Sequence, residues 1–308
     1  MSRYQNTNSL FLEPTTTQYG SHQVMTNVHM PNKTKLVCVD TIFADDTGIG
    51  GALPLASTPA TVQIDDVVNG ATAISVVSVS LPLSFYNVSA SLKNNCITLV
   101  NSGGGVYTIT VSDGTYTAAT LPAAVNAALL SAGITNVSCA FYNSCSKLTS
   151  TSAYSYTMYL DALSALPERS SALKSCLGWL LGYRRPASVL PAGGALLSPA
   201  WISLAVPGYL YLTLDDFTNG APNSMLVPST MGMMPRNVIA RISVDTVNNS
   251  SGSVVHAFQN DGSLVSDVRR YSAQINFRKV RTQIVNAFGA PIDFNGLSYS
   301  FVLQIEHV

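Results

Sequence analysis

The stretch Ala73-Ile-Ser-Val-Val-Ser-Val-Ser-Leu-Pro-Leu83 decides the fold, because it is a dense run of apolar and mostly β-branched residues. Ile74 and Val76 share one face of the predicted strand, whereas the apolar residues from Val77 onward share the other. This change of phase indicates either a β-bulge or a strand that is buried on both faces. Pro82 cannot donate a ladder hydrogen bond, so we expect strand pairing to end near it.

A hairpin and a short helix follow this strand. Residues 96–100 and 106–111 are predicted strands, and the run Ser102-Gly-Gly-Gly105 between them supplies the positive φ angles of a hairpin turn. A helix is predicted over residues 121–130, where leucine and valine form one apolar stripe, and Gly133 ends it.

Most of the other apolar segments alternate in the manner of strands. These predicted strands cover residues 35–43, 61–64, 136–142, 147–151, 154–160, 200–206, 209–214, 238–245, 254–258, 273–286 and 298–308. A second helix is predicted over residues 167–181, and the Pro-, Gly- and Ala-rich residues 186–199 are predicted to form a loop. The pattern is typical of an all-β protein.

Several short motifs occur in an order that resembles one family of viral proteins. The matching residues are Leu81-Pro-Leu-Ser-Phe-Tyr-Asn-Val88, Asn94-Asn95, Asp113-Gly-Thr-Tyr-Thr117, the helix at 121–130 and Val285-Asn-Ala-Phe-Gly-Ala-Pro-Ile-Asp-Phe-Asn-Gly296. Over residues 60–308 the chain resembles the single jelly-roll vertex (penton) and minor capsid proteins of large icosahedral DNA viruses of the chlorovirus, iridovirus and mimivirus kind. The resemblance implies an antiparallel jelly roll and a structural role in a capsid.

The composition favours a protein whose surface is covered by other subunits. Charged residues make up 10% of the chain, and 16 basic and 16 acidic residues cancel to a net charge of zero. An ordinary soluble domain has about 25% charged residues, and neutrality promotes association. The sequence has no strongly basic patch for nucleic acid and no apolar run of the ~18 residues that a membrane span requires. The polar N-terminus also predicts synthesis in the cytoplasm, without a secretory signal.

Residues 1–60 differ from the rest and are expected to be an N-terminal arm and linker. The arm has no long helical or strand period, so we expect its stabilising contacts to come from a neighbouring subunit; a self-packed β-hairpin is the alternative. Its large apolar residues, which are candidate interface residues, are Tyr4, Leu10, Phe11 and Leu12. A methionine-rich stretch at 219–236 is a second candidate contact, through Met231, Met233 and Met234, with plain loop packing as the alternative.

The residue patterns of catalysis and metal binding are missing from the sequence. Asp65-Asp66 and Asp215-Asp216 are adjacent carboxylates, but neighbours along a strand point to opposite faces and cannot share a substrate. Arg184-Arg185 and Arg269-Arg270 could meet acidic neighbours or glycans, but runs of two residues are usually solvated, so we expect solvated pairs. The five cysteines form no CxxC pair and no cluster with histidine, which predicts reduced thiols rather than a zinc site. We therefore expect no enzyme activity, no catalytic residues, no cofactor and no metal.

These observations predict an all-β protein: an antiparallel single jelly roll at residues 61–308, with two short helices in its connections. More strands are predicted than a bare jelly roll needs, so we allow for an insertion within about residues 150–235. The expected function is that of a capsid subunit, a homopentamer at the five-fold vertices that contacts the major capsid protein and other minor capsid proteins in the virion. The alternatives are a minor capsid protein that braces the shell from inside, or a carbohydrate-binding β-sandwich.

Overall fold

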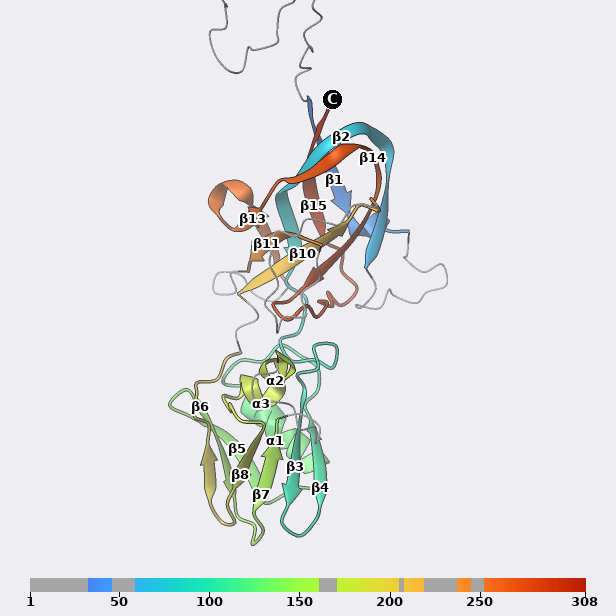
Figure 1. Ribbon diagram of the computed structural model, residues 1–308. Helices are drawn as coiled ribbons and strands as arrows, with labels where there is room; N and C mark the ends of the chain where they lie inside the picture. Colours follow the sequence, from blue (N-terminus) through green and yellow to red (C-terminus); the bar gives the residue numbers. More distant parts are fainter. Residues whose placement is uncertain (1–32, 46–58, 161–170, 205–207, 219–236, 245–251) are drawn as a thin grey trace, which may run out of the picture.

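The chain folds around two separate hydrophobic cores, which Figure 1 shows as two lobes. The computed structural model describes residues 33–45, 59–160, 171–204, 208–218, 237–244 and 252–308. The first core is made by strands from the two ends of this range. They are β1 (Lys33–Asp40), β2 (Ala60–Pro82), β10 (Tyr209–Asp215), β11 (Val238–Ser243), β12 (Val254–Phe258), β13 (Leu264–Ser266), β14 (Arg269–Val285) and β15 (Ser300–His307).

These strands pair in the order of a jelly roll, which confirms the predicted all-β fold class. The C-terminal half of β2 pairs with β15 on one side and β12 on the other, and β1 pairs with β15, giving the order β1–β15–β2–β12. The N-terminal half of β2 pairs with β14, giving a second order, β2–β14–β10–β11, with β13 beyond β11. Because β2 runs through both, the strands form one antiparallel sheet that curls into a sandwich. Gly70, with a φ of 68°, lies between the two halves of β2.

The change of phase at Val77 is a β-bulge. In the ladder between β2 and β15, Ser78 pairs with Val302 and Val76 pairs with Leu303, so Val77 is the extra residue. The bulge returns Val79 to the same face as Val76, and both are buried in the first core while Val77 is only half-buried. The prediction is confirmed, and β2 ends at Pro82 as expected.

The second core is built from one continuous stretch of the chain, between Val88 and Leu204. Its strands are β3 (Cys96–Asn101), β4 (Val106–Thr110), β5 (Val137–Tyr142), β6 (Cys145–Ser150), β7 (Tyr156–Tyr159), β8 (Ala187–Leu190) and β9 (Ala195–Leu197). We call the sheet β4–β3–β7–β8 sheet D and the sheet β5–β6–β9 sheet E. The helices are α1 (Leu121–Ser131), α2 (Ser171–Ser175) and α3 (Leu177–Leu180), and two 3₁₀ helices, η2 (Thr41–Phe43) and η3 (Gln259–Asp261), belong to the jelly roll.

Local sequence signals place most elements of the second core correctly. The predicted helix at 121–130 is α1, whose Leu121, Val125 and Leu129 are buried, and Gly133 follows with a φ of 81°. The hairpins β3–β4 and β5–β6 are both present. The second predicted helix is two short helices, α2 and α3, separated at Cys176, and its residues 167–170 lie outside the described part of the chain.

Two predictions in this region are wrong. Residues 186–199, predicted as a loop, contain β8 and β9, because β7 and β6 offer them open edges for hydrogen bonding. Conversely, the described residues 200–204 of the predicted strand 200–206 form no strand. Their backbone instead bonds to the end of the helical segment: the Ala200 N–H donates to the Gly182 carbonyl and the Ser203 N–H to the Leu180 carbonyl.

Candidate functional site at the junction of the two cores

The motif residues of the sequence, which lie far apart in the chain, meet where the second core joins the jelly roll. Asn87 stands at the point where the chain enters the second core. Its Nδ2 donates to the carbonyls of Tyr116 at 2.7 Å and Leu204 at 3.3 Å, and its Oδ1 accepts from the Tyr116 N–H at 2.9 Å. Leu204 is the last described residue packed in the second core. The Asn87 side chain therefore links the segment that leads into the second core to the segment that leaves it.

Asn94 and Asp113 complete this network. The Oδ1 of Asn94 accepts from the Ser89 N–H at 2.7 Å, and its Nδ2 donates to the Asn87 carbonyl at 2.8 Å. One carboxylate oxygen of Asp113 accepts from the Ala90 N–H at 2.8 Å and from Asn95 Nδ2 at 3.3 Å. Asn94 is buried and both ends of its amide are bonded, as buried polar groups require. These motif residues therefore hold the backbone in place where the jelly roll joins the second core.

The second motif, at 285–296, lies on the jelly-roll side of this junction. The Ser84 hydroxyl donates to the Phe294 carbonyl at 2.6 Å, and Asn295 Nδ2 donates back to the Ser84 carbonyl. The rings of Phe85 and Phe294 pack edge to face with their centroids 5.9 Å apart. The two stretches that carry the family resemblance are thus in direct contact.

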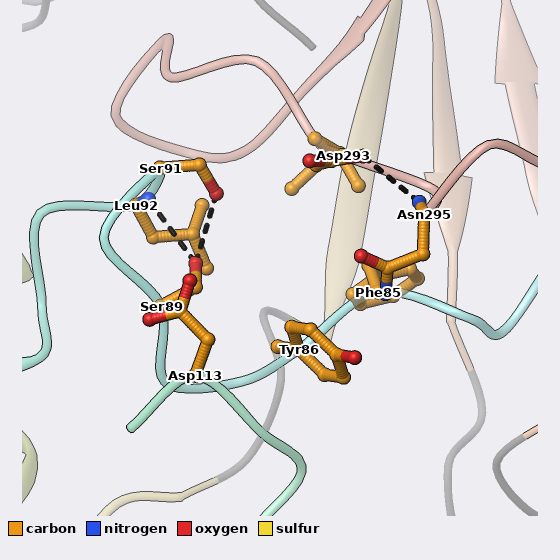
Figure 2. Close-up of a pocket in the computed structure, with 9 residues that line it drawn as sticks. Phe85, Tyr86, Ser89, Ser91, Leu92, Asp113, Asp293 and Asn295 are labelled. Carbon is orange, nitrogen blue, oxygen red and sulfur yellow. Dashed lines mark hydrogen bonds between the residues drawn. The ribbon is translucent and has the colours of Figure 1, made fainter. Parts of the chain in front are cut away.

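A small pocket lies between these two sides, and Figure 2 shows its lining. Asp113 reaches it from the second core and Asp293 from the jelly roll, on different sides of the pocket. One oxygen of Asp293 accepts from the Asn295 N–H at 2.8 Å. The rest of the lining is Phe85, Tyr86, Ser89, Ser91, Leu92, Ile292 and Asn295. Two carboxylates fall short of a metal site, and nowhere in the described ranges do three or more His, Cys, Asp or Glu side chains gather to hold an ion.

A charged cluster is buried in the jelly roll next to β10. Asp216 accepts from the Tyr271 hydroxyl at 2.6 Å and from the Thr218 hydroxyl at 2.6 Å, and its carboxylate lies 3.6 Å from the Arg269 guanidinium. Burial by itself raises the pKa of Asp216, but the hydrogen bonds from Thr218 and Tyr271, with the charge of Arg269, outweigh it and hold the pKa below the ordinary value. Asp216 is therefore a structural anion.

The cluster corrects one expectation and explains another. Arg269, expected to be solvated, is 6% exposed and donates to the carbonyls of Leu214 at 3.0 Å and Asn237 at 3.3 Å. Asp215, predicted to point to the opposite face from Asp216, has a different partner, because its carboxylate accepts from the Phe217 N–H at 3.0 Å. In the second core, Arg184 is likewise not free in solvent, because its guanidinium lies 4.3 Å from the centre of the Trp179 ring.

Among the described residues, the closest approach to a catalytic pattern is a pair on the surface of the jelly roll. Ser80 Oγ and His256 Nδ1 lie 2.9 Å apart across the β2–β12 ladder. The pair is exposed, and neither Asp65 nor Asp216 is bonded to it in the described structure. An activated serine needs a site that excludes water and a group that orients its histidine, and this pair has neither in the described structure.

The cysteines that lie closest in the sequence are separated by the strand register. Cys139 pairs with Leu148 and Cys145 pairs with Tyr142 in the β5–β6 ladder, so they occupy different rows. Burial raises the pKa of the Cys139 thiol to about 12, which keeps it protonated and unreactive. Cys38, on the outer face of β1, is exposed.

The sequence-predicted interface residues lie outside the described part of the chain, so their placement stays a prediction. They are Tyr4, Leu10, Phe11, Leu12, Met231, Met233 and Met234. The surface that is described carries other large apolar side chains, including Phe43 at 75% exposure, Trp201 at 73% and Leu36 at 62%. No helix within the described ranges combines the length and the apolar character that crossing a membrane would take.

Comparison with known proteins finds similarity in structure and none in sequence. No protein-family model matches the sequence, and no curated protein matches it. Among solved structures, the chain is similar to the crystal structure of a mavirus penton protein, with a TM-score of 0.42 and 11% sequence identity, over 90% of this chain and 100% of that one.

Proposed function

We propose that the protein is a structural subunit of a viral capsid and forms a homopentamer at the five-fold vertices. The observation that carries the proposal is the convergence of the motif residues. Four of the segments that resemble penton and minor capsid proteins, at 81–88, 94–95, 113–117 and 285–296, meet at one junction, on a jelly roll of the strand order that the resemblance implies.

The surface supports an assembled state. Phe43, Trp201 and Leu36 are each more than half exposed, in a chain with 10% charged residues and no net charge. Covering one such side chain contributes about 1.5–3 kcal/mol, so several in one contact favour association strongly. In this proposal the partners are further copies of the chain, the major capsid protein and other minor capsid proteins, and the site of action is the virion.

The exposed aromatic residues weigh against a carbohydrate-binding sandwich. A glycan site would gather them at one end of the roll. Instead Phe43, Phe217 and Phe258 belong to the jelly roll, whereas Tyr142, Tyr154 and Trp201 belong to the second core. This distribution favours several contact surfaces over one binding site.

Native mass spectrometry of the purified chain tests the proposal. The expected species has the mass of five chains of 32.6 kDa, with unlike faces in contact because a ring must close. An obligate contact of this kind buries upwards of about 2,000 Å² per pair. A stable monomer or a trimer overturns the vertex assignment, and a monomer that binds the inner side of an assembled shell indicates the bracing role instead.

We also propose that the arm fastens neighbouring subunits. The large apolar residues Phe11 and Leu12 stand in a polar segment, and burying each contributes about 1.5–3 kcal/mol. Deleting residues 2–30 is expected to leave the unfolding temperature of the subunit unchanged and to lower the yield of assembled rings. A truncated chain that fails to fold contradicts the proposal, because the arm then belongs to the core.

A further inference from the structure

The outer faces of sheets D and E are nearly free of charge. In sheet D one cross-strand row runs Val106–Val100–Thr157–Val189, and in sheet E the equivalent row runs Ala140–Lys147–Leu197. Strand alternation turns these residues away from the second core, which holds their neighbours Leu99, Met158 and Leu148. Across the described strands of both sheets, Lys147 is the only charged side chain at an outward position.

This composition is unusual for sheet faces that meet water. The outward face of an antiparallel sheet is normally polar, and about 25–35% of a soluble surface is charged. Here Val106, Val189 and Leu197 are each at least half exposed, and most of the remaining outward positions are Thr, Ser or Ala. Small side chains of this kind allow two sheets to stack closely.

The two faces lie on different sides of the lobe. In Figure 1, β5 and β6 of sheet E lie on the left of the second core and β3 and β4 of sheet D on its right, with β7 and β8 of sheet D between them. A closed ring requires two unlike surfaces on each subunit, one for each neighbour. If the lobes stand side by side around the ring with these two sides turned towards their neighbours, the D side of one lobe faces the E side of the next.

We infer that the outer face of sheet D on one copy packs against the outer face of sheet E on the neighbouring copy. This inference rests on the ring assembly proposed above and adds a contact between lobes to it. The row centred on Thr157 meets the row centred on Lys147. The contact aligns neutral surfaces and leaves Lys147 as the one side chain whose charge the opposing face must accommodate.

The size of the faces determines how strong the contact is. Strands spaced about 4.8 Å apart with a rise of about 3.3 Å per residue give each face roughly 300 Å² in projection. One D-on-E contact therefore buries roughly 600 Å² in total, well below the ~1,200–2,000 Å² of a stable interface. The lobes alone do not hold two copies together, and the contact works only beside the contacts of the jelly rolls.

Charge substitution at the two row centres tests the inference, with the native Lys147 as the probe. In the full-length chain, Thr157→Lys places a like charge against Lys147 and is expected to raise the concentration at which rings half-dissociate at least tenfold. Thr157→Glu is expected to lower that concentration, and the exchange Thr157→Lys with Lys147→Glu to restore it. Because charges at an interface are screened within about 8–10 Å, the differences shrink at high salt.

The control adds the same charge to the same lobe away from both sheets. Ala127 is exposed on α1, so Ala127→Lys is expected to leave dissociation unchanged. Circular dichroism shows whether each variant remains folded. If Thr157→Lys alone unfolds the lobe, Thr157→Glu and the exchange variant still test the contact.

If none of these variants changes the dissociation of the rings, the lobe contact is wrong and the pentamer proposal is unaffected. If Thr157→Lys and Thr157→Glu both weaken association and Lys147→Glu has no effect, sheet D meets a surface other than sheet E and the inference is wrong. A wild-type chain that forms no ring overturns both proposals.

Discussion

The jelly roll and the second core are assembled from the chain in opposite ways. The jelly roll pairs its ends, with β1 against β15 and β2 against both β14 and β15. The second core uses one continuous stretch and is rich in local hairpins, such as β3–β4 and β5–β6. Non-local pairing carries a larger loop-closure cost and slows folding. We therefore expect the second core to form first and to fold without the jelly roll.

Their buried polar groups also differ in kind. The jelly roll buries the ion pair of Asp216 and Arg269. The second core uses neutral groups: the buried Ser146 hydroxyl donates to the Leu181 carbonyl at 2.7 Å, and the half-buried Asn126 bonds both the N–H and the carbonyl of Cys139. A buried charge that loses its partner is far more costly than a neutral group that loses one hydrogen bond. Substitutions and acid should therefore affect the two cores separately.

The largest effect is expected from Asp216→Ala. The substitution leaves Arg269 buried without its counter-charge, which costs about 3–5 kcal/mol of the free energy of unfolding. Hydrogen exchange followed by mass spectrometry should show lost protection in β10, β11 and β14, and unchanged protection between residues 88 and 204. Asp65→Ala is the control, since Asp65 is exposed in the same sheet. Loss of protection in both cores would show that they unfold as one unit.

The reciprocal experiment is Gly182→Ala in the second core. Gly182 has a φ of 97°, and an added Cβ would lie 2.1 Å from the Ala200 carbonyl oxygen. Backbone strain of about 1–2 kcal/mol and overpacking of about 1–3 kcal/mol together predict a loss of about 2–5 kcal/mol, confined to the second core. Gly193→Ala separates the two terms, because Gly193 also has a positive φ but has nothing within 4 Å of the added atom. Equal losses in the two variants, by denaturant unfolding of the second core, would rule out the contact with Ala200.

Sequence patterns predict this structure where the signal is local and fail where strand pairing decides. The irregularity at Val77 is predictable because a phase change in a run of valines indicates either a β-bulge or a strand buried on both faces, and the strand register shows that it is a bulge. The strands β8 and β9 are not predictable in this way, because Pro191, Gly193 and Gly194 punctuate them and only the open edges of β7 and β6 make them strands. The burial of Arg269 escapes prediction for the same reason, since it depends on Asp216, more than fifty residues away.

The junction shows the same limit at the level of the site. The motifs of the sequence include Asn87, Asn94 and Asp113, but nothing in their spacing reveals their chemistry. Their partners include Tyr116 and Leu204, which no spacing rule connects to them. A polar residue that closes a network across the fold is recognised only when the backbone groups it satisfies are known.

Acid is expected to destabilise the jelly roll before the second core. Because the pKa of folded Asp216 lies below its unfolded value, the carboxylate contributes stability that is present above the unfolded pKa of about 3.9 and is lost as the pH falls through the folded pKa. The described residues of the second core include no buried carboxylate. Thermal unfolding between pH 6 and pH 3 should therefore move only the jelly-roll transition. In Asp216→Asn that shift should be smaller, and an undiminished shift would assign the acid sensitivity to other groups.

The smallest effect is expected at the bulge, from Ser266→Ala. The Val76 N–H has left the regular ladder next to Val77 and donates to Ser266 Oγ at 3.0 Å, which ties β13 to β2. Removing the hydroxyl leaves this amide without its acceptor and costs about 1 kcal/mol. Ser300→Ala is the matched control, since Ser300 lies in the neighbouring strand β15 and pairs with Ser80. The decisive measurement is the exchange rate of the Val76 amide, which should rise in Ser266→Ala and stay constant in Ser300→Ala. An unchanged rate would mean that the curl of the sheet, and not Ser266, protects the bulge, and that β13 adds nothing to the closure of the jelly roll.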